Sequence, residues 1–276
     1  MNRKELNPEA SPQAKFGAEL RRVREEQGLV QEEIAEAAKY SASHISAVET
    51  ARKKPTLPFA QSMDVVLRTG DFFEKEWRKI TYGSLLQGFP EYVGNEARAT
   101  EVRLYNIGII PGLLQTPEYA RVLANSAFER GEITEQQADD RVSFLLDRQQ
   151  KLLQRLRPPM MFVVMDESCI LRPVGGPEVM GAQLDSLIEF AASPRTMLQI
   201  APFAMGERRS LNLPVNLITM ADRTMLYYAE SQAQGNFARE TPAVAGALTA
   251  YHQLQAEALS QAESVAMIRQ VRKGTP

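Results

Sequence analysis

The stretch LRRVREEQGLVQEEIAEAAKYSASHISAVETARKKP, residues 20–55, constrains the fold of this chain more than any other segment. Apolar residues at helical spacing predict a first helix over about 12–27. Gly28 is suited to end this helix because glycine adopts the left-handed conformation without strain. A second helix is predicted to start at Gln31, and Ser41 is the expected N-cap of a third. A basic helix followed by two short helices around a tight turn is the pattern of a helix-turn-helix.

The third predicted helix has one apolar and one polar face. Ile45 and Val48 are spaced to point inward. The outward face is then formed by four short side chains: Ala42, Ser43, Ser46 and Ala47. His44 lies near the edge of this face. Because the second short helix of a helix-turn-helix enters the major groove of DNA, these positions are the candidate base contacts.

The distribution of charge is more informative than its sum, which is −2. Residues 1–80 hold 14 Lys and Arg against 13 Asp and Glu, with two basic clusters. The clusters are Arg21, Arg22 and Arg24, and Arg52, Lys53 and Lys54. Such clusters are more often solvated surface, but both flank the third helix. We expect the second cluster to supply the phosphate contacts that dominate affinity for double-stranded DNA.

This stretch resembles the phage-repressor-like (Cro/C1, or xenobiotic-response-element) helix-turn-helix family. The resemblance covers about residues 14–70 and rests on G-L-x-Q-E-E-I-A, then S-x-S-H-I-S-x-V-E, then the basic run and Pro55. It implies that Gln31, at the start of the second helix, holds a phosphate. The positions that read bases in family members correspond to Ala42, Ser43 and Ala47. It also implies an ion pair between Arg24 and Glu49, an internal brace and not a binding site.

The sequence departs from the family pattern in three ways. Val30 stands where Thr is usual, so the second helix loses a side-chain cap worth about 1 kcal/mol. Lys39 and Ala51 stand where glycine is common, which predicts mild strain in left-handed turns. The outward face offers only methyl groups and hydroxyls, with no Arg, Gln or Asn for a bidentate base contact. We therefore expect specificity to depend on His44, on DNA shape or on a dimer that reads two half-sites.

Two more helices are predicted at the end of the first domain, one from Leu57 to Leu67 and one over 72–86 with Asp71 as N-cap. Beyond a boundary near 82–90, strands alternate with helices. Strands are predicted over 101–107, 161–167 and 196–203, with a hairpin over 215–230. Capping signals start helices at Thr116, Thr134 (to about 157), Gly176 and Ser260, with a further helix over 242–258. The predicted fold class is α+β overall: an all-α five-helix repressor-like helix-turn-helix domain over 1–82, then an α+β domain over 83–276 with a small sheet and flanking helices.

The second half resembles the uncharacterised domain that follows the helix-turn-helix in many actinobacterial regulators. The resemblance covers about 95–272 and rests on IIPGLLQTPEYARVL, DRQQKLLQRLRPP, FVVMDESCILRPVGGPEVMGAQLDSLIEFA and LQIAPF. It implies an antitoxin-like transcriptional regulator, a type often encoded beside a small partner protein.

No constellation of residues predicts an enzyme. Asp166 and Glu167 are adjacent on a predicted strand, where successive side chains point to opposite faces, so they cannot act together on one substrate. Cys169 is the single cysteine, and we expect a buried, inert thiol. With two histidines and one cysteine there is no zinc-ligand spacing, so neither a metal nor a cofactor is expected.

One turn in the second half is a candidate site for an anionic ligand or a partner. Arg172 precedes Gly175 and Gly176 at a predicted helix start, where free backbone N–H groups bind anions. The alternative is a sharp strand-to-helix turn with a solvated arginine.

No apolar run is long enough to span a bilayer, and the N-terminus lacks the apolar segment of a secretory signal, so a cytoplasmic, nucleoid-associated protein is expected. The sequence predicts a homodimeric, sequence-specific DNA-binding regulator whose C-terminal domain responds to a small ligand or a small partner protein. One alternative is an antitoxin-like module that sequesters a small partner and binds DNA only for autoregulation. Another is a scaffold that no longer binds DNA.

Overall fold

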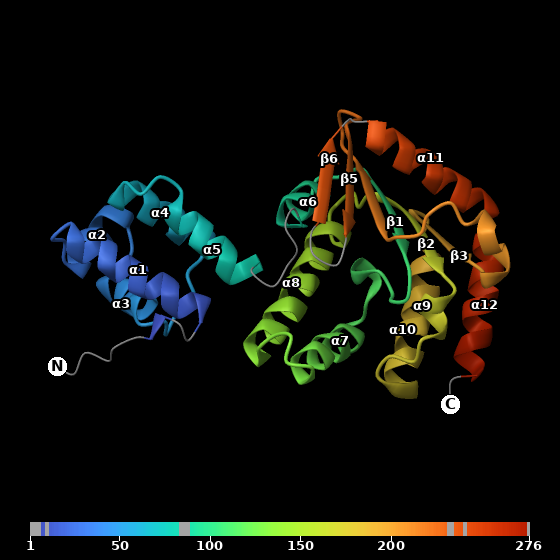
Figure 1. Cartoon of the computed structure of the whole chain (residues 1–276), viewed down its shortest axis with the longest axis horizontal. Helices are drawn as coiled ribbons and strands as arrows, with labels where there is room; N and C mark the ends of the chain where they lie inside the picture. Colours follow the sequence, from blue (N-terminus) through green and yellow to red (C-terminus); the bar gives the residue numbers. More distant parts are fainter. Residues whose placement is uncertain (1–6, 9–10, 83–88, 231–234, 240–241, 275–276) are drawn as a thin grey trace. The chain divides into compact units, whose positions relative to one another are not determined.

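The computed structural model describes residues 7–8, 11–82, 89–230, 235–239 and 242–274, and it divides into two compact units, Met1–Ser84 and Leu85–Pro276 (Figure 1). The described part of the first unit is built of helices, and the second unit surrounds a six-stranded sheet with helices. The predicted fold class, an all-α domain followed by an α+β domain, is confirmed.

The described helices of the first unit enclose one apolar core. Their bounds are α1 Pro12–Glu26, α2 Gln31–Ala38, α3 Ala42–Glu49, α4 Leu57–Leu67 and α5 Phe72–Tyr82. The largest buried side chains of this core are Phe16, Leu20, Ile34, Ile45, Phe59, Met63 and Phe73. The predicted continuation of the fifth helix over 83–86 lies outside the described residues.

The ends of the short helices follow from local chemistry. Ser41 caps α3, since its Oγ accepts a hydrogen bond from the His44 N–H at 3.2 Å. Val30 has no side-chain oxygen with which to cap α2. Its backbone N–H donates a hydrogen bond to the Glu33 carboxylate at 2.8 Å, which is the second of the two hydrogen bonds of a capping box. The left-handed conformation predicted at Lys39 and Ala51 is confirmed: φ is 60° at Lys39 and 53° at Ala51.

We expect Ala51→Gly to raise the free energy of unfolding by about 0.5 kcal/mol. The left-handed conformation costs alanine roughly 1–2 kcal/mol, and the greater freedom of glycine in the unfolded chain offsets roughly 0.4–1 kcal/mol of that gain. Equilibrium urea unfolding measures the change. The matched control is Ala47→Gly inside α3, where the same replacement should destabilise by about 1 kcal/mol. Destabilisation by both variants would contradict the strain at Ala51.

The sheet of the second unit has the strand order β3-β2-β1-β4-β5-β6. The strands are β1 Glu101–Asn106, β2 Met160–Asp166, β3 Thr196–Ala201, β4 Val215–Thr219, β5 Met225–Glu230 and β6 Gly235–Arg239. The pairs β1–β2 and β2–β3 are parallel. The pairs β1–β4, β4–β5 and β5–β6 are antiparallel. β1 is therefore the strand at which the parallel half of the sheet meets the antiparallel half.

Helices cover both faces of the sheet. They are α6 Phe89–Glu96, α7 Pro117–Glu129, α8 Glu135–Leu153, α9 Ser168–Leu171, α10 Gly176–Ala191, α11 Pro242–Glu257 and α12 Gln261–Gly274. Leu104 belongs to the core under α6, α10 and α12, while its neighbour Tyr105 belongs to the core under α11. Because helices bury both faces of the sheet, β2 is apolar along nearly its whole length, from Met160 to Met165.

Most predicted elements of this unit are found, with small corrections at their ends. Thr116, Thr134 and Ser260 accept the capping hydrogen bonds expected of them. The long helix α8 ends at Leu153, earlier than the expected position near 157. The elements α6, α9 and β6 were not predicted from the sequence.

Candidate nucleic-acid interface

The outward face of α3 is smaller than the sequence predicts. Ile45 and Val48 are fully buried, as expected, and Ser43 is exposed. The Oγ of Ser43 lies 3.0 Å from the Oγ of the capping residue Ser41. Ala42 instead packs against the core of the first unit and is half-buried. Ser46 and Ala47 are half-buried as well, but Ala47 is not among the residues that pack against this core. Ser43, Ser46 and Ala47 therefore stay the candidate base contacts of this face.

His44 was expected near the edge of the outward face of α3, but its ring is turned toward α4. Its ring stacks on Phe59 of α4, with centroids 5.1 Å apart and an interplanar angle of 11°, and it meets the edge of Tyr40. Its Nε2 is buried and has no hydrogen-bond partner among the described residues. Burial, and then the nearby Lys53 ammonium, lowers the pKa of His44, so the ring is neutral at pH 7. The other ring nitrogen, Nδ1, lies 3.4 Å from the Lys53 ammonium at the surface, so one edge of the ring is packed on α4 and the other lies beside the 52–54 cluster.

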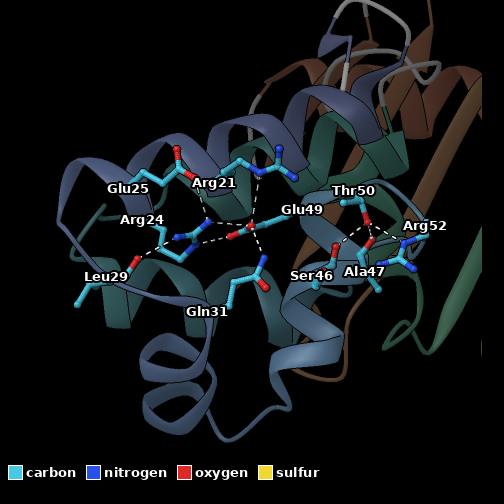
Figure 2. A network of polar contacts seen from close by, with 10 residues as sticks. All are labelled: Arg21, Arg24, Glu25, Leu29, Gln31, Ser46, Ala47, Glu49, Thr50 and Arg52. Atoms are coloured by element: carbon cyan, nitrogen blue, oxygen red, sulfur yellow. Dashed lines mark hydrogen bonds and ion pairs between the residues drawn. The ribbon is translucent and has the colours of Figure 1, made fainter. Parts of the chain in front are cut away.

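A buried brace joins the first three helices (Figure 2). Arg24 of α1 donates two hydrogen bonds to Glu49 of α3, at 2.6 and 3.0 Å, and a third to the Leu29 carbonyl at 2.9 Å. Glu49 is completely buried, and its hydrogen bonds with Arg24 raise the pKa of that guanidinium. The pair implied by the family resemblance is therefore present, and it fixes α3 against α1.

Gln31 is part of the same brace. Its Nε2 donates to Glu49 at 2.7 Å, as Figure 2 shows. The side-chain amide of Gln31 is therefore engaged within the domain, and a phosphate contact at the start of α2 stays a prediction. Arg21 also lies 3.6 Å from the Glu49 carboxylate.

The two basic clusters differ in their partners. In the α1 cluster, Arg22 pairs with Glu19 and Glu26 at 2.8 and 2.6 Å, and Arg24 pairs with Glu49. In the second cluster all three side chains, Arg52, Lys53 and Lys54, are exposed. Arg52 and Lys53 have no carboxylate partner among the described residues. The 52–54 cluster is therefore better suited than the α1 cluster to contact DNA phosphates.

Backbone hydrogen bonds hold the 52–54 cluster to the end of α3. The N–H groups of Arg52 and Lys53 both donate to the Ala47 carbonyl, at 2.8 and 3.0 Å. The Nε of Arg52 donates to the Oγ1 of Thr50 at 2.9 Å, and that hydroxyl donates to the Ser46 carbonyl (Figure 2). The candidate base contacts and the candidate phosphate contacts are thus parts of one rigid segment.

The residues of the candidate site in the second unit, Arg172, Gly175 and Gly176, each have contacts within that unit. Arg172 is exposed, and its Nε donates to the Gly108 carbonyl at 2.8 Å, toward the loop after β1. Gly175 has a φ of 70°, and a Cβ there would lie 2.8 Å from the Cβ of Val179. Packing therefore explains this glycine. The arrangement is that of a sharp turn with an exposed arginine.

The polar residues considered for catalysis are separated. Asp166 pairs with Arg209 at 3.1 Å, whereas Glu167 accepts the Phe203 N–H at 2.6 Å. Cys169 is fully buried, and burial raises the pKa of its thiol to about 12. Over the described ranges, His, Cys, Asp and Glu form no cluster suited to a metal ion, and none of the helices has the length and apolar character needed to cross a membrane.

Comparison with known protein families gives two matches. A helix-turn-helix domain matches residues 15–71, and a domain of unknown function (DUF5753) matches residues 89–270, more than half of the chain. No curated protein and no solved structure matches significantly. The first match contains α3 and the 52–54 cluster, and it supports a DNA-binding regulator. The chain belongs to the DUF5753 family and carries a helix-turn-helix domain in front of the domain that defines it.

Proposed function

We propose that this protein is a cytoplasmic, sequence-specific transcriptional regulator that binds double-stranded DNA as a homodimer. The observation that carries the proposal is the rigid segment from Ser43 to Lys53. It joins the short side chains of Ser43, Ser46 and Ala47 to Arg52 and Lys53, which have no carboxylate partner in the described part of the chain. The buried Glu49 holds the segment in place. In this proposal the second unit receives a signal from a small ligand or a small partner protein.

α3 enters the major groove, and the 52–54 cluster contacts phosphates beside it. Base contacts are assigned to Ser43, Ser46 and Ala47: hydroxyls donate to or accept from either base edge, and the methyl group contacts thymine. His44 is left out of this set because it packs on Phe59. Since such short side chains discriminate weakly, two half-sites read by a dimer supply the remaining specificity.

Selection of duplexes from a randomised pool tests this assignment without knowledge of the operator. The full-length protein should enrich a motif with two related halves. Ser43→Ala should change the preferred base at one position in each half, with affinity for the wild-type motif falling roughly fivefold, since a single lost hydroxyl contact costs about 1 kcal/mol.

Lys53→Ala is the contrasting variant in the same selection. It should weaken binding to all sequences alike and leave the motif unchanged, because a phosphate contact carries no base information. Enrichment of no motif by the wild-type protein would refute a sequence-specific regulator. An unchanged motif in Ser43→Ala would show that the base-contacting face is assigned wrongly.

A second candidate function is sequestration of a small partner protein in the manner of an antitoxin. It is favoured by exposed apolar side chains at the end of the sheet where the parallel strands finish. They are Ile109, Leu171, Phe203 and Leu213, with exposures of 40, 46, 58 and 60%. Ile109, Leu171 and Phe203 follow the carboxyl ends of β1, β2 and β3, respectively. Leu213 precedes β4, which begins at the same end of the sheet. The Cys169 thiol donates to the Ile109 carbonyl, and Glu167 accepts from Phe203, so these segments are linked. Clustered exposed apolar residues are typical of interaction surfaces.

Co-expression with the small proteins encoded next to the gene, followed by purification, tests this function. Phe203→Asp should abolish co-purification of a true partner, whereas Phe128→Asp, at a residue 43% exposed on α7, should not. Equal recovery of a partner with both variants would place its binding site elsewhere.

A further inference from the structure

A cavity of about 310 Å³ lies at the carboxyl end of β1, between β1 and β4. Leu104 and Asn106 of β1, Asn216 of β4 and the segment 107–113 form most of its wall. Phe89 of α6 and Arg148 of α8 close it from the helical layer. The volume is at the lower end of the range for small-molecule sites, roughly 300–1,000 Å³.

The position of the cavity in the sheet is one that favours ligands. The chain crosses from β1 to β2 on one side, while β4 adds to the other side in the opposite direction. The segment that leaves the carboxyl end of β1 and the segment that enters β4 both lie at this end of the sheet, and the cavity is lined by residues of both. In open α/β sheets, ligands bind in the crevice outside the carboxyl ends of the strands.

The sheet register brings two side-chain amides to this space. Asn216 pairs with Leu104, and Asn106 follows two residues later on β1. Since side chains alternate along a strand, Asn106 and Asn216 project from the same face. The Asn216 amide reaches only a long contact, 3.5 Å to the Tyr228 carbonyl. The side chain of Asn106 makes no hydrogen bond within the described part of the chain.

The remaining polar groups of the wall are satisfied and leave it without net charge. Arg148 donates to the buried Glu96 at 2.6 and 2.8 Å, and its guanidinium lies 5.0 Å above the Phe89 ring. Gln115 donates to the Ile110 carbonyl at 2.7 Å, and Gln149 donates to the carbonyls of Gly112 and Gln115. The loop wall is therefore fixed before any ligand enters.

We propose that this cavity binds an uncharged heterocycle that presents a hydrogen-bond donor beside an acceptor, the pattern of a nucleobase. Asn106 and Asn216 supply the complementary acceptor and donor. Phe89, Ile107 and Ile109 offer the accessible apolar surface that contacts the ring. Because Glu96 already neutralises Arg148, a phosphate-bearing ligand finds no free charge here. The inference rests on the proposed function in one respect: occupation of the cavity is the signal that changes DNA affinity.

Thermal unfolding of the full-length protein with a panel of free nucleobases, their nucleosides and the nucleoside monophosphates tests the site. At least one uncharged member is expected to raise Tm by roughly 5 °C at a concentration far above its Kd. Asn106→Leu, which keeps the branched shape of the side chain but removes its polar atoms, should weaken that ligand at least tenfold while the free protein keeps its Tm. Asn125→Leu, at an exposed asparagine of α7, is the matched control and should bind like the wild type.

The site is overturned if no uncharged member raises Tm, if only the monophosphates do, or if Asn106→Leu binds as tightly as the wild type. DNA affinity measured with and without the ligand separates this inference from the proposed function. If a ligand binds the cavity but the protein does not bind DNA, the ligand site is supported and the proposed role as a DNA-binding regulator is refuted. A DNA-binding protein unaffected by every panel member refutes the signal role of the cavity alone.

Discussion

Glu49→Gln is expected to lower the free energy of unfolding of the first unit by about 3–5 kcal/mol. The replacement keeps the shape of the side chain but removes the buried carboxylate that lies 2.6 Å from the Arg24 guanidinium, whose side chain is 9% exposed. The longer contact of Arg24 with Glu25, at 3.5 Å to a side chain that is 44% exposed, remains. Removing one partner of a buried ion pair costs this much because the remaining charge stays desolvated. DNA binding should be lost together with the fold of the unit.

Urea unfolding followed by tryptophan fluorescence measures this change directly. Trp77 is the single tryptophan of the chain and packs against the core of the first unit, so its signal reports on that unit. Glu19→Gln is the matched control: its partner Arg22 is 52% exposed, and exposed pairs contribute about 0–1 kcal/mol.

The double variant Arg24→Met, Glu49→Leu should recover much of the lost stability, since replacing a buried pair by apolar residues is often neutral. Equal, small effects of Glu49→Gln and Glu19→Gln would show that the brace does not hold α3 in place.

Replacement of Arg52, Lys53 and Lys54 together by alanine is expected to weaken DNA binding by two to three orders of magnitude at about 0.1 M salt. Each phosphate contact that is lost removes roughly 0.9 from the slope of log K against log salt, and about one order of magnitude in affinity at this salt concentration. The slope should therefore fall by roughly 2.7. Stability should change by less than about 0.5 kcal/mol, because the three side chains are exposed.

The control for this triple variant removes the same charge from the second unit. Arg121, Arg130 and Lys151 are surface residues whose side chains are 42, 56 and 64% exposed. Their joint replacement by alanine should leave affinity and salt slope near the wild-type values. A similar loss in both triple variants would mean that net charge, and not the position of the 52–54 cluster, determines binding.

Local signals explain which elements the sequence could predict. The boundaries of α7, α8 and α12 follow from the caps at Thr116, Thr134 and Ser260, whose hydrogen bonds join residues close in sequence. The strand β6 and the helix α6 lack such signals. α6 is stabilised by contacts with distant residues, such as Tyr92 stacked on Tyr228 at 5.0 Å.

The same distinction applies to the candidate sites. Helical spacing alone placed Ser43 on an exposed face and Ile45 in the core. The position of His44 depends on the ring of Phe59 from another helix, which no spacing within α3 reveals. Arg172 is held by a carbonyl 64 residues away, at Gly108. The cavity beside β1 exists only because the sheet brings Asn106 and Asn216 together.

Sequence-specific DNA binding is the central claim, and fluorescence anisotropy tests it most directly. The purified full-length protein is titrated into labelled duplex from its own upstream region and into a scrambled duplex of the same composition, over a series of salt concentrations. The upstream duplex is expected to bind more tightly at every salt concentration, with affinity for both falling steeply as salt rises. Weak and equal affinity for the two duplexes would contradict a sequence-specific regulator and leave partner sequestration as the function of the chain.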